Sequence, residues 1–353
     1  MLEKQELLGP SYYGIALQTA VDAINDCANR EDAQIIMNAT IERLASEIPA
    51  SKRFVGPDSK IIVLPEYFLT AYPLGDTIEG WAQKACIHVD GSEYEKLGKI
   101  AQDNDIYLAG NAYEIDDHFP GLYFQTCFII GPNGNVILRY RRLNSMFAPT
   151  PHDVWDKYLD IYGMEGVFPV AKTEIGNLAA IASEEILYPE IARCLAMRGA
   201  EVFLHSTGEM GNMSETPKQI ARKARALENM AYIISANSGS IRGHELPKSS
   251  TDGRSAVINY KGQIMTEAGY GETMTANDCI DLNALRKYRR RPGMSNYLAR
   301  QRFEMFADTY GNEGSQKANS LLDQNGNHKI PDRAHFISAQ TETIANLAKK
   351  KVI

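Results

Sequence analysis

The chain has 353 residues, of which 44% are hydrophobic and 23% are charged, and its net charge is −7. This composition is that of an ordinary globular protein with a sizeable core. Because sequence-independent binding to nucleic acid depends on neutralising phosphates, the negative charge argues against a nucleic-acid partner. No basic stretch followed by an apolar stretch opens the chain, and no run of about 18 apolar residues follows, so we expect neither a signal peptide nor a membrane span.

The cysteines and histidines are dispersed in a way that argues against a metal centre. No two cysteines form a CxxC pair, and the five lie far apart, at Cys27, Cys86, Cys127, Cys194 and Cys279. We therefore expect a cytoplasmic protein with free thiols that are packed in its core. The seven histidines lack ligand spacing, so we expect no metal or other cofactor, and activity that survives a chelator.

Strand-like and helix-like segments alternate in chain order up to about residue 283. Apolar or alternating runs predict strands at residues 13–20, 61–64, 106–112, 123–130, 136–140, 178–182, 201–205, 232–236, 255–260 and 263–266. Helical spacing predicts helices at residues 32–50, 189–198 and 217–231. No linker rich in Gly, Ser or Pro interrupts this stretch, so residues 1–283 are expected to form one α/β domain.

The last 70 residues, 284–353, differ in character from the rest, because they are polar and helical. We interpret the basic run at 287–291 (KYRRR) as a solvated or carboxylate-paired surface rather than a nucleic-acid site. The segment 323–327 lacks the carboxylates of a calcium loop and predicts a polar turn. Aromatic residues in this extension favour an arm that packs on a neighbouring subunit, although it could instead fold back on its own domain: Tyr288, Tyr297, Phe303, Phe306 and Tyr310.

Polar residues follow three of the predicted strands at the point where each strand ends. Glu66 and Tyr67 follow one strand, Arg142 ends a second, and Ser183-Glu184-Glu185 follows a third. Any one of these carboxylates alone would be interpreted as a cap or a surface residue. Because ligand sites in α/β sheets form at strand ends, the three together predict a site.

The order of these blocks resembles the nitrilase superfamily of carbon–nitrogen hydrolases, most closely its aliphatic amidase and formamidase branch. The resemblance covers about residues 12–283 and rests on the ordered set IVLPE (62–66), YRR (140–142), FAPTPHDVW (147–155), SEEILYPEIAR (183–193), GAEV (199–202), RALEN (225–229) and GRS (253–255). It implies a four-layer αββα sandwich, hydrolysis of non-peptide carbon–nitrogen bonds, and assembly into a dimer or larger homo-oligomer.

Two of the three catalytic positions that the resemblance implies are changed in this chain. The family uses a glutamate base, a lysine that stabilises the oxyanion and a cysteine nucleophile. Here Glu66 is retained, Arg142 stands at the lysine position and Ser183 stands at the cysteine position. A serine hydroxyl is not ionised and needs a base, which Glu66 could supply, whereas Arg142 holds an oxyanion or carboxylate but shuttles no proton. Cys194 is expected in the core.

Around these residues we expect contacts to a small-molecule substrate. The candidates are Tyr67, Asp153, Glu184, Glu185 and His205. Three of them have plain structural alternatives: Asp153 as a surface carboxylate, Glu185 as a residue that holds the turn, and His205 as a satisfied histidine at a strand end.

Two hypotheses about function remain open from the sequence. The first is an amidase-like hydrolase that acts on a small amide or related compound through Ser183, or through a water activated by Glu66. The second is a catalytically silent homologue that binds a small ligand or a partner protein. A separation of about 3.2 Å between Ser183 Oγ and Glu66 would favour the first. An Arg142 that occupies both oxygens of Glu66 would favour the second.

Overall fold

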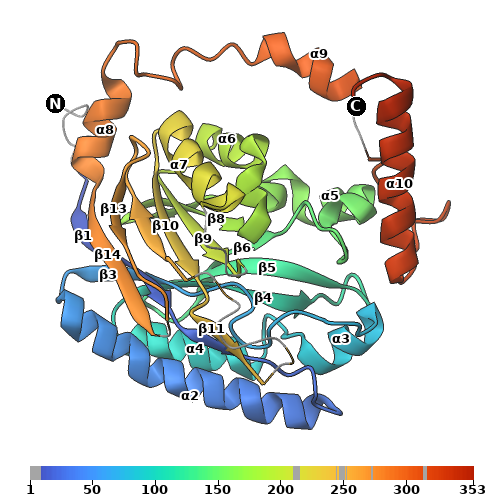
Figure 1. The fold of residues 1–353 in the computed structure, drawn as a ribbon, viewed down its shortest axis with the longest axis horizontal. Helices are drawn as coiled ribbons and strands as arrows, with labels where there is room; N and C mark the ends of the chain where they lie inside the picture. The colour runs from blue at the N-terminus through green and yellow to red at the C-terminus, as the bar shows by residue number, and fades with distance from the viewer. Residues whose placement is uncertain are drawn as a thin grey trace.

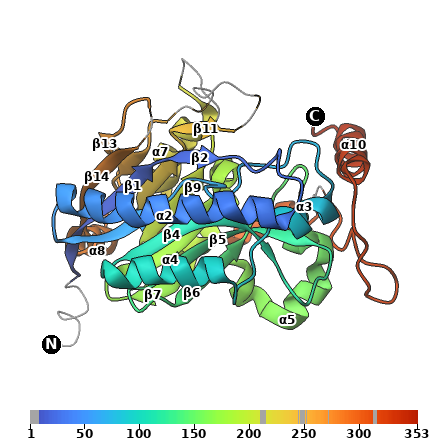
Figure 2. The ribbon, with the colours of Figure 1, turned by 90° about the horizontal axis from the view of Figure 1, so that it is seen from below.

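Two six-stranded β-sheets packed face to face form the centre of the protein (Figure 1). The structure, a computed structural model, describes residues 9–209, 215–243, 245, 251, 253–271, 273–312 and 316–353. Helices lie on the outer face of each sheet, so the order of layers is αββα (Figures 1 and 2). The four-layer α/β sandwich expected from the sequence is confirmed.

The first sheet contains strands from both ends of the domain. Its strands run in the order β14 (Met274–Asp281), β1 (Ser11–Gln18), β3 (Ser59–Val63), β4 (Tyr107–Ile115), β5 (Tyr123–Ile130) and β6 (Val136–Arg141). β1, β3 and β4 are parallel, whereas β14, β5 and β6 run antiparallel to their neighbours. β3 and β6 therefore end at different positions along one sheet, and polar residues follow both strand ends.

The second sheet has a parallel centre and antiparallel edges. Its strands run in the order β13 (Ile264–Glu267), β12 (Ala256–Ile258), β10 (Tyr232–Asn237), β9 (Val202–Thr207), β8 (Gly176–Ala182) and β7 (Ala171–Thr173). β8, β9 and β10 are parallel, so their carboxyl ends share one edge of the sheet. A small parallel pair, β2 (Ala20–Asp22) and β11 (Ser240–Arg242), stands apart from both sheets.

Helices cover the two outer faces. α2 (Arg30–Val55) and α4 (Ser92–Asp103) lie on the first sheet, with α3 (Ile78–Ala85) beside them. α6 (Pro189–Met197) and α7 (Pro217–Asn229) lie on the second. No helix in the described part of the chain is both long enough and apolar enough to cross a membrane.

The interface between the sheets is apolar and closely packed. Ala16, Val63 and Ile129 of the first sheet belong to the same buried cluster as Leu204 and Ile234 of the second. The fit is close enough that a Cβ added to Gly14 of β1 would overlap the Ile234 side chain. The central strands are thus fixed against each other, and the positions of their ends are fixed with them.

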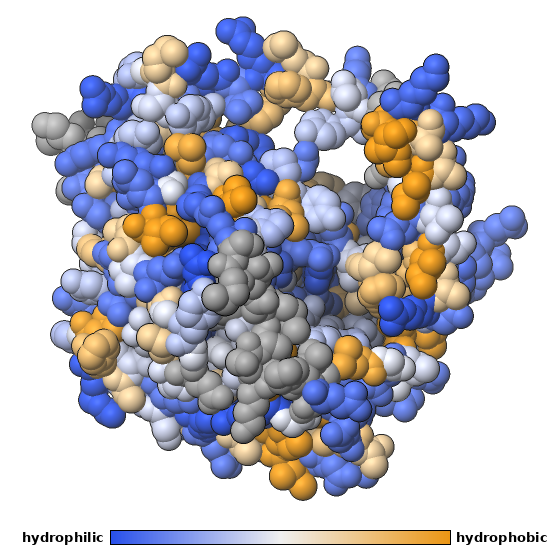
Figure 3. Space-filling model, viewed as in Figure 1, coloured by the Kyte–Doolittle hydropathy of each residue, from blue (hydrophilic) through white to orange (hydrophobic). Residues whose placement is uncertain are grey.

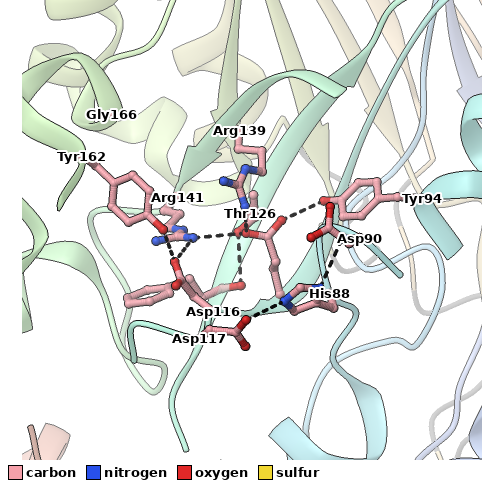
Figure 4. Close-up of polar contacts among 12 residues, drawn as sticks. His88, Asp90, Tyr94, Asp116, Asp117, Thr126, Arg139, Arg141, Tyr162 and Gly166 are labelled. Atoms are coloured by element: carbon pink, nitrogen blue, oxygen red, sulfur yellow. Dashed lines mark hydrogen bonds and ion pairs between the residues drawn. The ribbon is translucent and has the colours of Figure 1, made fainter. Parts of the chain in front are cut away.

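One end of the first sheet carries a buried polar cluster (Figure 4). The carboxylate of Glu114, which is fully buried, accepts hydrogen bonds from Arg139, Arg141 and Tyr94. Arg141 also pairs with Asp116, and this arginine holds the pKa of the Asp116 carboxyl well below its usual range despite partial burial. Because a buried charge must be paired, this cluster holds β4 and β6 together. Arg142, the residue after Arg141, is not part of the cluster.

The chain after β14 continues on the domain through α8 (Leu282–Arg290). Leu282 and Leu285 are fully buried. Arg286 Nε and Nη2 contact the Glu201 carboxylate at 2.7 and 3.0 Å, and Arg289 donates to the backbone carbonyls of Met230 and Ala200. One arginine of the basic run therefore binds helix and strand ends rather than facing solvent.

Beyond α8 the chain forms a strap that crosses the molecule through α9 (Glu304–Asn312) and ends in α10 (Arg333–Lys349) (Figure 1). The strap rejoins its own domain where Leu321 N donates to Asp153 O at 2.9 Å and Leu321 is fully buried. Figure 3 shows an opening between the strap and the domain. The segment 323–327 is a turn in which the Asp323 carboxylate accepts from two backbone N–H groups.

A buried glutamate attaches the end of β8 to the end of β6. Glu185 lies in the short 3-10 helix η2 (Ser183–Leu187) and accepts hydrogen bonds from Tyr140 Oη at 2.6 Å, Leu143 N at 2.8 Å and Asn144 N at 2.9 Å. Burial raises the pKa of Glu185 from 4.5 to about 7, although the hydrogen bonds oppose this shift. Glu185 therefore holds two chain segments from different sheets together.

The raised pKa of Glu185 predicts a pH-dependent stability. Between about pH 4.5 and about pH 7 the folded chain keeps a proton on Glu185 that the unfolded chain has released, so the free energy of unfolding falls as pH rises. Urea denaturation should show this fall, on the order of 2–4 kcal/mol, in the wild type relative to Glu185→Gln. The exposed Glu165→Gln is the matched control. A difference between wild type and Glu185→Gln that is constant across this range would contradict the prediction.

Candidate functional site

The polar residues at three strand ends meet between the two sheets. Glu66 follows β3, Arg142 follows β6 and Ser183 follows β8, and all three side chains are buried. Arg142 Nη1 lies 3.7 Å from Glu66 Oε1, and Arg142 Nη2 pairs with the carboxylate of Glu184, the residue after Ser183. Glu66 N also donates to the carbonyl of Thr207 at the end of β9, which joins the two sheets at this point.

Gln125 of β5 orients both Glu66 and Arg142, and no motif in the sequence pointed to it. Its Nε2 donates to Glu66 Oε1 at 2.6 Å and to Asn111 Oδ1 at 3.1 Å. Its Oε1 accepts from Arg142 Nη1 at 2.7 Å. One amide therefore fixes the distance between the carboxylate and the guanidinium.

Every nitrogen of the Arg142 guanidinium has a hydrogen-bond or ion-pair partner. Besides the contacts to Gln125 and Glu184, its Nε donates to Asn144 O at 2.6 Å. Burial alone would lower the pKa of Arg142, but Tyr67, Glu66 and Glu184 around it raise the pKa above its ordinary value. Arg142 is thus a permanent cation held between two carboxylates.

Tyr67 adopts a left-handed backbone conformation, with φ of 53°, directly after Glu66. Its ring stacks on that of Tyr113, with centroids 5.1 Å apart and planes 7° from parallel. Burial, followed by the charge of Glu66, raises the pKa of Tyr67 well above its ordinary value, so its hydroxyl stays protonated. Tyr67 is therefore a neutral neighbour of the carboxylate.

Ser183 also has a left-handed backbone, with φ of 47°, at the sharp turn from β8 into η2. Non-glycine residues are rarely held in this conformation unless the surroundings fix it, and such positions cluster at functional sites. Arg225 contributes from α7 by donating to the carbonyls of Ile186 and Leu187 at the other end of η2. The turn is thus fixed at both ends.

His205 lies behind this turn and is fully buried. Its Nε2 lies 2.8 Å from the carbonyl oxygen of Ser183, and its Nδ1 lies 2.9 Å from Ser235 Oγ. Burial lowers the pKa of His205 to about 3, so the ring is neutral. Because a carbonyl only accepts, Nε2 carries the proton and Nδ1 accepts from Ser235. His205 supports the backbone of Ser183 rather than its hydroxyl.

The Ser183 hydroxyl is contacted by a lysine that the sequence did not reveal. Lys218, in the first turn of α7, places Nζ 3.0 Å from Ser183 Oγ and 3.2 Å from Thr207 Oγ1. Within the described parts of the chain, no hydrogen bond joins Ser183 Oγ to Glu66. The contact could not be predicted from the sequence, because Lys218 and Ser183 are 35 residues apart along the chain.

Of the remaining predicted substrate contacts, Asp153 and Glu185 have structural roles, whereas Glu184 is partly exposed. Asp153 caps the short helix η1 (Pro151–Val154), since its carboxylate accepts from Thr150 N, Thr150 Oγ1 and Ser320 Oγ. Glu185 holds the turn described above. The side chain of Glu184 is 39% exposed, so this carboxylate is the one that solvent and ligands can reach.

A cavity of about 720 Å³ adjoins the site on the side of Glu184. Its walls come from the loop after β6, from η1 and α5 (Trp155–Val167), from α6 and from the strap. The residues that border it include Asn144, Thr150, Glu184, Tyr188, His335 and Phe336. The cavity is large enough for a small organic molecule, and α10 forms one wall.

The described residues contain no group of three or more His, Cys, Asp or Glu side chains placed to hold a metal ion. The five cysteines are free. Cys86 and Cys127 are buried in the core as expected, but Cys194 in α6 is only half-buried, so the expectation that it lies in the core is wrong; its partial burial raises the pKa of its thiol.

The domain matches known proteins in both sequence and structure. The sequence model described as "Carbon-nitrogen hydrolase" matches residues 17–290. Mouse omega-amidase NIT2 is 24% identical over 232 residues, which cover 65% of this chain and 80% of that protein. Nitrilase homolog 2 of Dictyostelium discoideum is 26% identical over 235 residues, which cover 65% and 68%.

Two solved structures share the fold at lower identity. A carbon-nitrogen hydrolase from Helicobacter pylori G27 superposes with a TM-score of 0.63 at 19% identity, covering 85% of this chain and 98% of that one. Nit3 of Saccharomyces cerevisiae, described as a member of branch 10 of the nitrilase superfamily, gives 0.62 at 19% identity, covering 80% and 95%. Together with the sequence match over most of the domain, they show that this chain belongs to the carbon–nitrogen hydrolase family, within the nitrilase superfamily.

Proposed function

We propose that this protein hydrolyses a small amide or a related carbon–nitrogen compound, with Ser183 as the nucleophile. The observation that carries the proposal is the buried Ser183 hydroxyl at a left-handed turn, with an amine 3.0 Å away and a paired cation beside the turn. A hydroxyl, a proton-accepting group and a fixed positive charge are the parts that acyl transfer requires. The amidases among the relatives support an amide as the substrate class.

Arg142 supplies the positive charge for the oxyanion in this proposal. Its guanidinium is fixed by Gln125 and Asn144, while its third partner, Glu184, is the partly exposed one. A substrate oxygen that replaces Glu184 would receive the Nη2 hydrogen bond as negative charge develops on it. Glu184 would leave Nη2 when the substrate binds, while Gln125 and Asn144 keep the guanidinium in place.

The cavity beside Glu184 is the proposed entry path for the substrate. It is bordered by Glu184, the residue after Ser183, and by His335 and Phe336 of α10. Its border mixes aromatic rings, such as Tyr188 and Phe336, with amide and hydroxyl groups, such as Asn144 and Thr150. This mixture suits a small polar molecule with an apolar portion.

A second candidate is a silent homologue that binds a small ligand or a partner protein without turning it over. Two observations favour it: Gln125 already occupies Glu66 Oε1, and the Arg142 guanidinium is fully paired. In that case Glu66 and Arg142, at the family positions of the base and the oxyanion-stabilising cation, would only hold the fold together. Turnover measurements on defined variants separate the two candidates.

Ser183→Ala should abolish turnover, by a factor on the order of 10⁴ or more, because the nucleophile is lost while the fold is retained. The measurement is product release from a panel of amides, nitriles and carbamoyl compounds, with thermal unfolding as the check on folding. Equal activity in wild type and Ser183→Ala would exclude Ser183 and leave a water activated by Glu66. Absence of turnover in the wild type on the whole panel would favour the silent homologue.

Ser183→Cys alone should not create an efficient thiol enzyme. Arg142 is fixed by three partners, and it lacks the compact ammonium that the family lysine presents to the oxyanion. Adding Arg142→Lys should raise the turnover of Ser183→Cys at least about tenfold, or about 1.4 kcal/mol of transition-state stabilisation. The three enzymes are compared on one substrate from the panel. If the double variant is slower than Ser183→Cys, Arg142 does not obstruct thiol chemistry.

We also propose a cytoplasmic homo-oligomer, a dimer or larger. The free cysteines support a reducing compartment, and the strap exposes large side chains, with Met305 at 66% and Tyr310 at 63% exposure. Light scattering at micromolar concentration should give at least twice the 39.2 kDa of the single chain. A monomer at that concentration would contradict the assembly, and replacing Met305 and Tyr310 with serine tests whether the strap forms the contact.

A further inference from the structure

We infer that Lys218 is the general base that takes the proton from Ser183, because its Nζ lies 3.0 Å from the Ser183 hydroxyl. This inference rests on the proposed function, since it assigns the group that activates the proposed nucleophile. It assigns to Lys218 the role that the sequence analysis gave to Glu66.

The position of Lys218 is fixed by the start of α7. Thr216 and Gln219 form a reciprocal cap, in which Gln219 N donates to Thr216 Oγ1 at 3.3 Å and Thr216 N donates to Gln219 Oε1 at 3.2 Å. Arg254 Nη1 also donates to Gln219 Oε1 at 2.8 Å. Three hydrogen bonds therefore hold the first turn of the helix. Lys218 extends from this turn toward Ser183 and Thr207.

The other titratable groups near Ser183 are committed elsewhere. Glu66 Oε1 accepts from Gln125 at 2.6 Å and lies 3.7 Å from Arg142, and no hydrogen bond among the described residues links Glu66 to Ser183 Oγ. His205 contacts the carbonyl of Ser183, not its hydroxyl, and its second nitrogen accepts from Ser235. Lys218 Nζ, which donates to Ser183 Oγ in this structure, is left as the nitrogen within reach of the hydroxyl proton.

The step requires Lys218 to react as the amine, because an ammonium group has no lone pair to accept a proton. As the bond from Ser183 Oγ to the amide carbon forms, Nζ takes the hydroxyl proton and Arg142 faces the oxyanion. When the carbon–nitrogen bond breaks, Lys218 returns the proton to the nitrogen, which leaves as ammonia or an amine. Water then attacks the acyl ester and gives its proton to Nζ, the carboxylic acid departs, and Ser183 Oγ recovers the proton.

A small cavity lies beside Lys218. It measures about 10 Å³ and is bordered by Lys218, Thr207 and Asn237 among others, which is about the room of one water molecule with polar partners. The base and the site of the attacking water would then be neighbours. Relative to the family pattern, a lysine instead of the glutamate moves the proton, and an arginine instead of the lysine holds the charge.

The test measures how fast a fluorophosphonate probe reacts with Ser183, located by mass spectrometry. This reaction needs no knowledge of the substrate, because the serine oxygen displaces fluoride from phosphorus and the base takes the hydroxyl proton. Wild type should be labelled at Ser183, and both Lys218→Met and Lys218→Arg should react about 100-fold more slowly. Arginine keeps the positive charge but accepts no proton, so it separates a base from a simple cation.

The matched control is Lys223→Met, on the same helix, where the lysine pairs with Glu215 at the surface; its labelling rate should equal that of wild type. Thermal unfolding checks that each variant is folded. Wild-type rates in Lys218→Arg, or in Lys218→Met, would overturn the inference and leave Ser183 as the nucleophile. A wild type that turns over amides but is not labelled at Ser183 would overturn the proposed function and this inference together.

Discussion

The guanidinium of Arg142 is the interaction on which the rest of the site depends. It reaches Gln125 on β5, the carbonyl of Asn144 after β6 and Glu184 after β8, so one side chain joins segments from both sheets. A buried charge is stable only while it stays paired, so each of these partners helps to keep the Arg142 guanidinium in place. Through Glu184, Arg142 therefore helps to fix the position of the turn that carries Ser183.

Two residues with left-handed backbones, Tyr67 and Ser183, lie in the turns that carry the site; Ser183 directly follows β8, and Tyr67 comes after the end of β3. The Tyr67 ring stacks on Tyr113, and the neutral ring of His205 contacts the carbonyl of Ser183. Residues in this conformation cost of order 1–3 kcal/mol each, and seven other non-glycine residues among those described also have a positive φ.

The sequence revealed the scaffold better than the site. Residues 123–130 coincide with β5 because their apolar run is bounded by clear turn signals, whereas the polar edge strand β14 and the helix α5 had no period to reveal them. Glu66, Arg142 and Ser183 could be located because motifs mark strand ends. Gln125 and Lys218 could not, since a glutamine within a strand and a lysine on a helix are ordinary residues until tertiary contacts bring them to Glu66 and Ser183. The roles of Asp153 and Glu185 were likewise decided by partners distant in the chain.

The central claim is that Ser183 forms a covalent bond to the substrate's acyl group. The most direct measurement is peptide mass spectrometry on protein quenched in acid during turnover of an amide that the wild type accepts. The account predicts that the peptide containing Ser183 gains the mass of the acyl group, and that this adduct disappears once the substrate is exhausted. An adduct on another residue, such as Cys194, or turnover with no adduct on any peptide under conditions that trap acyl esters, would contradict it.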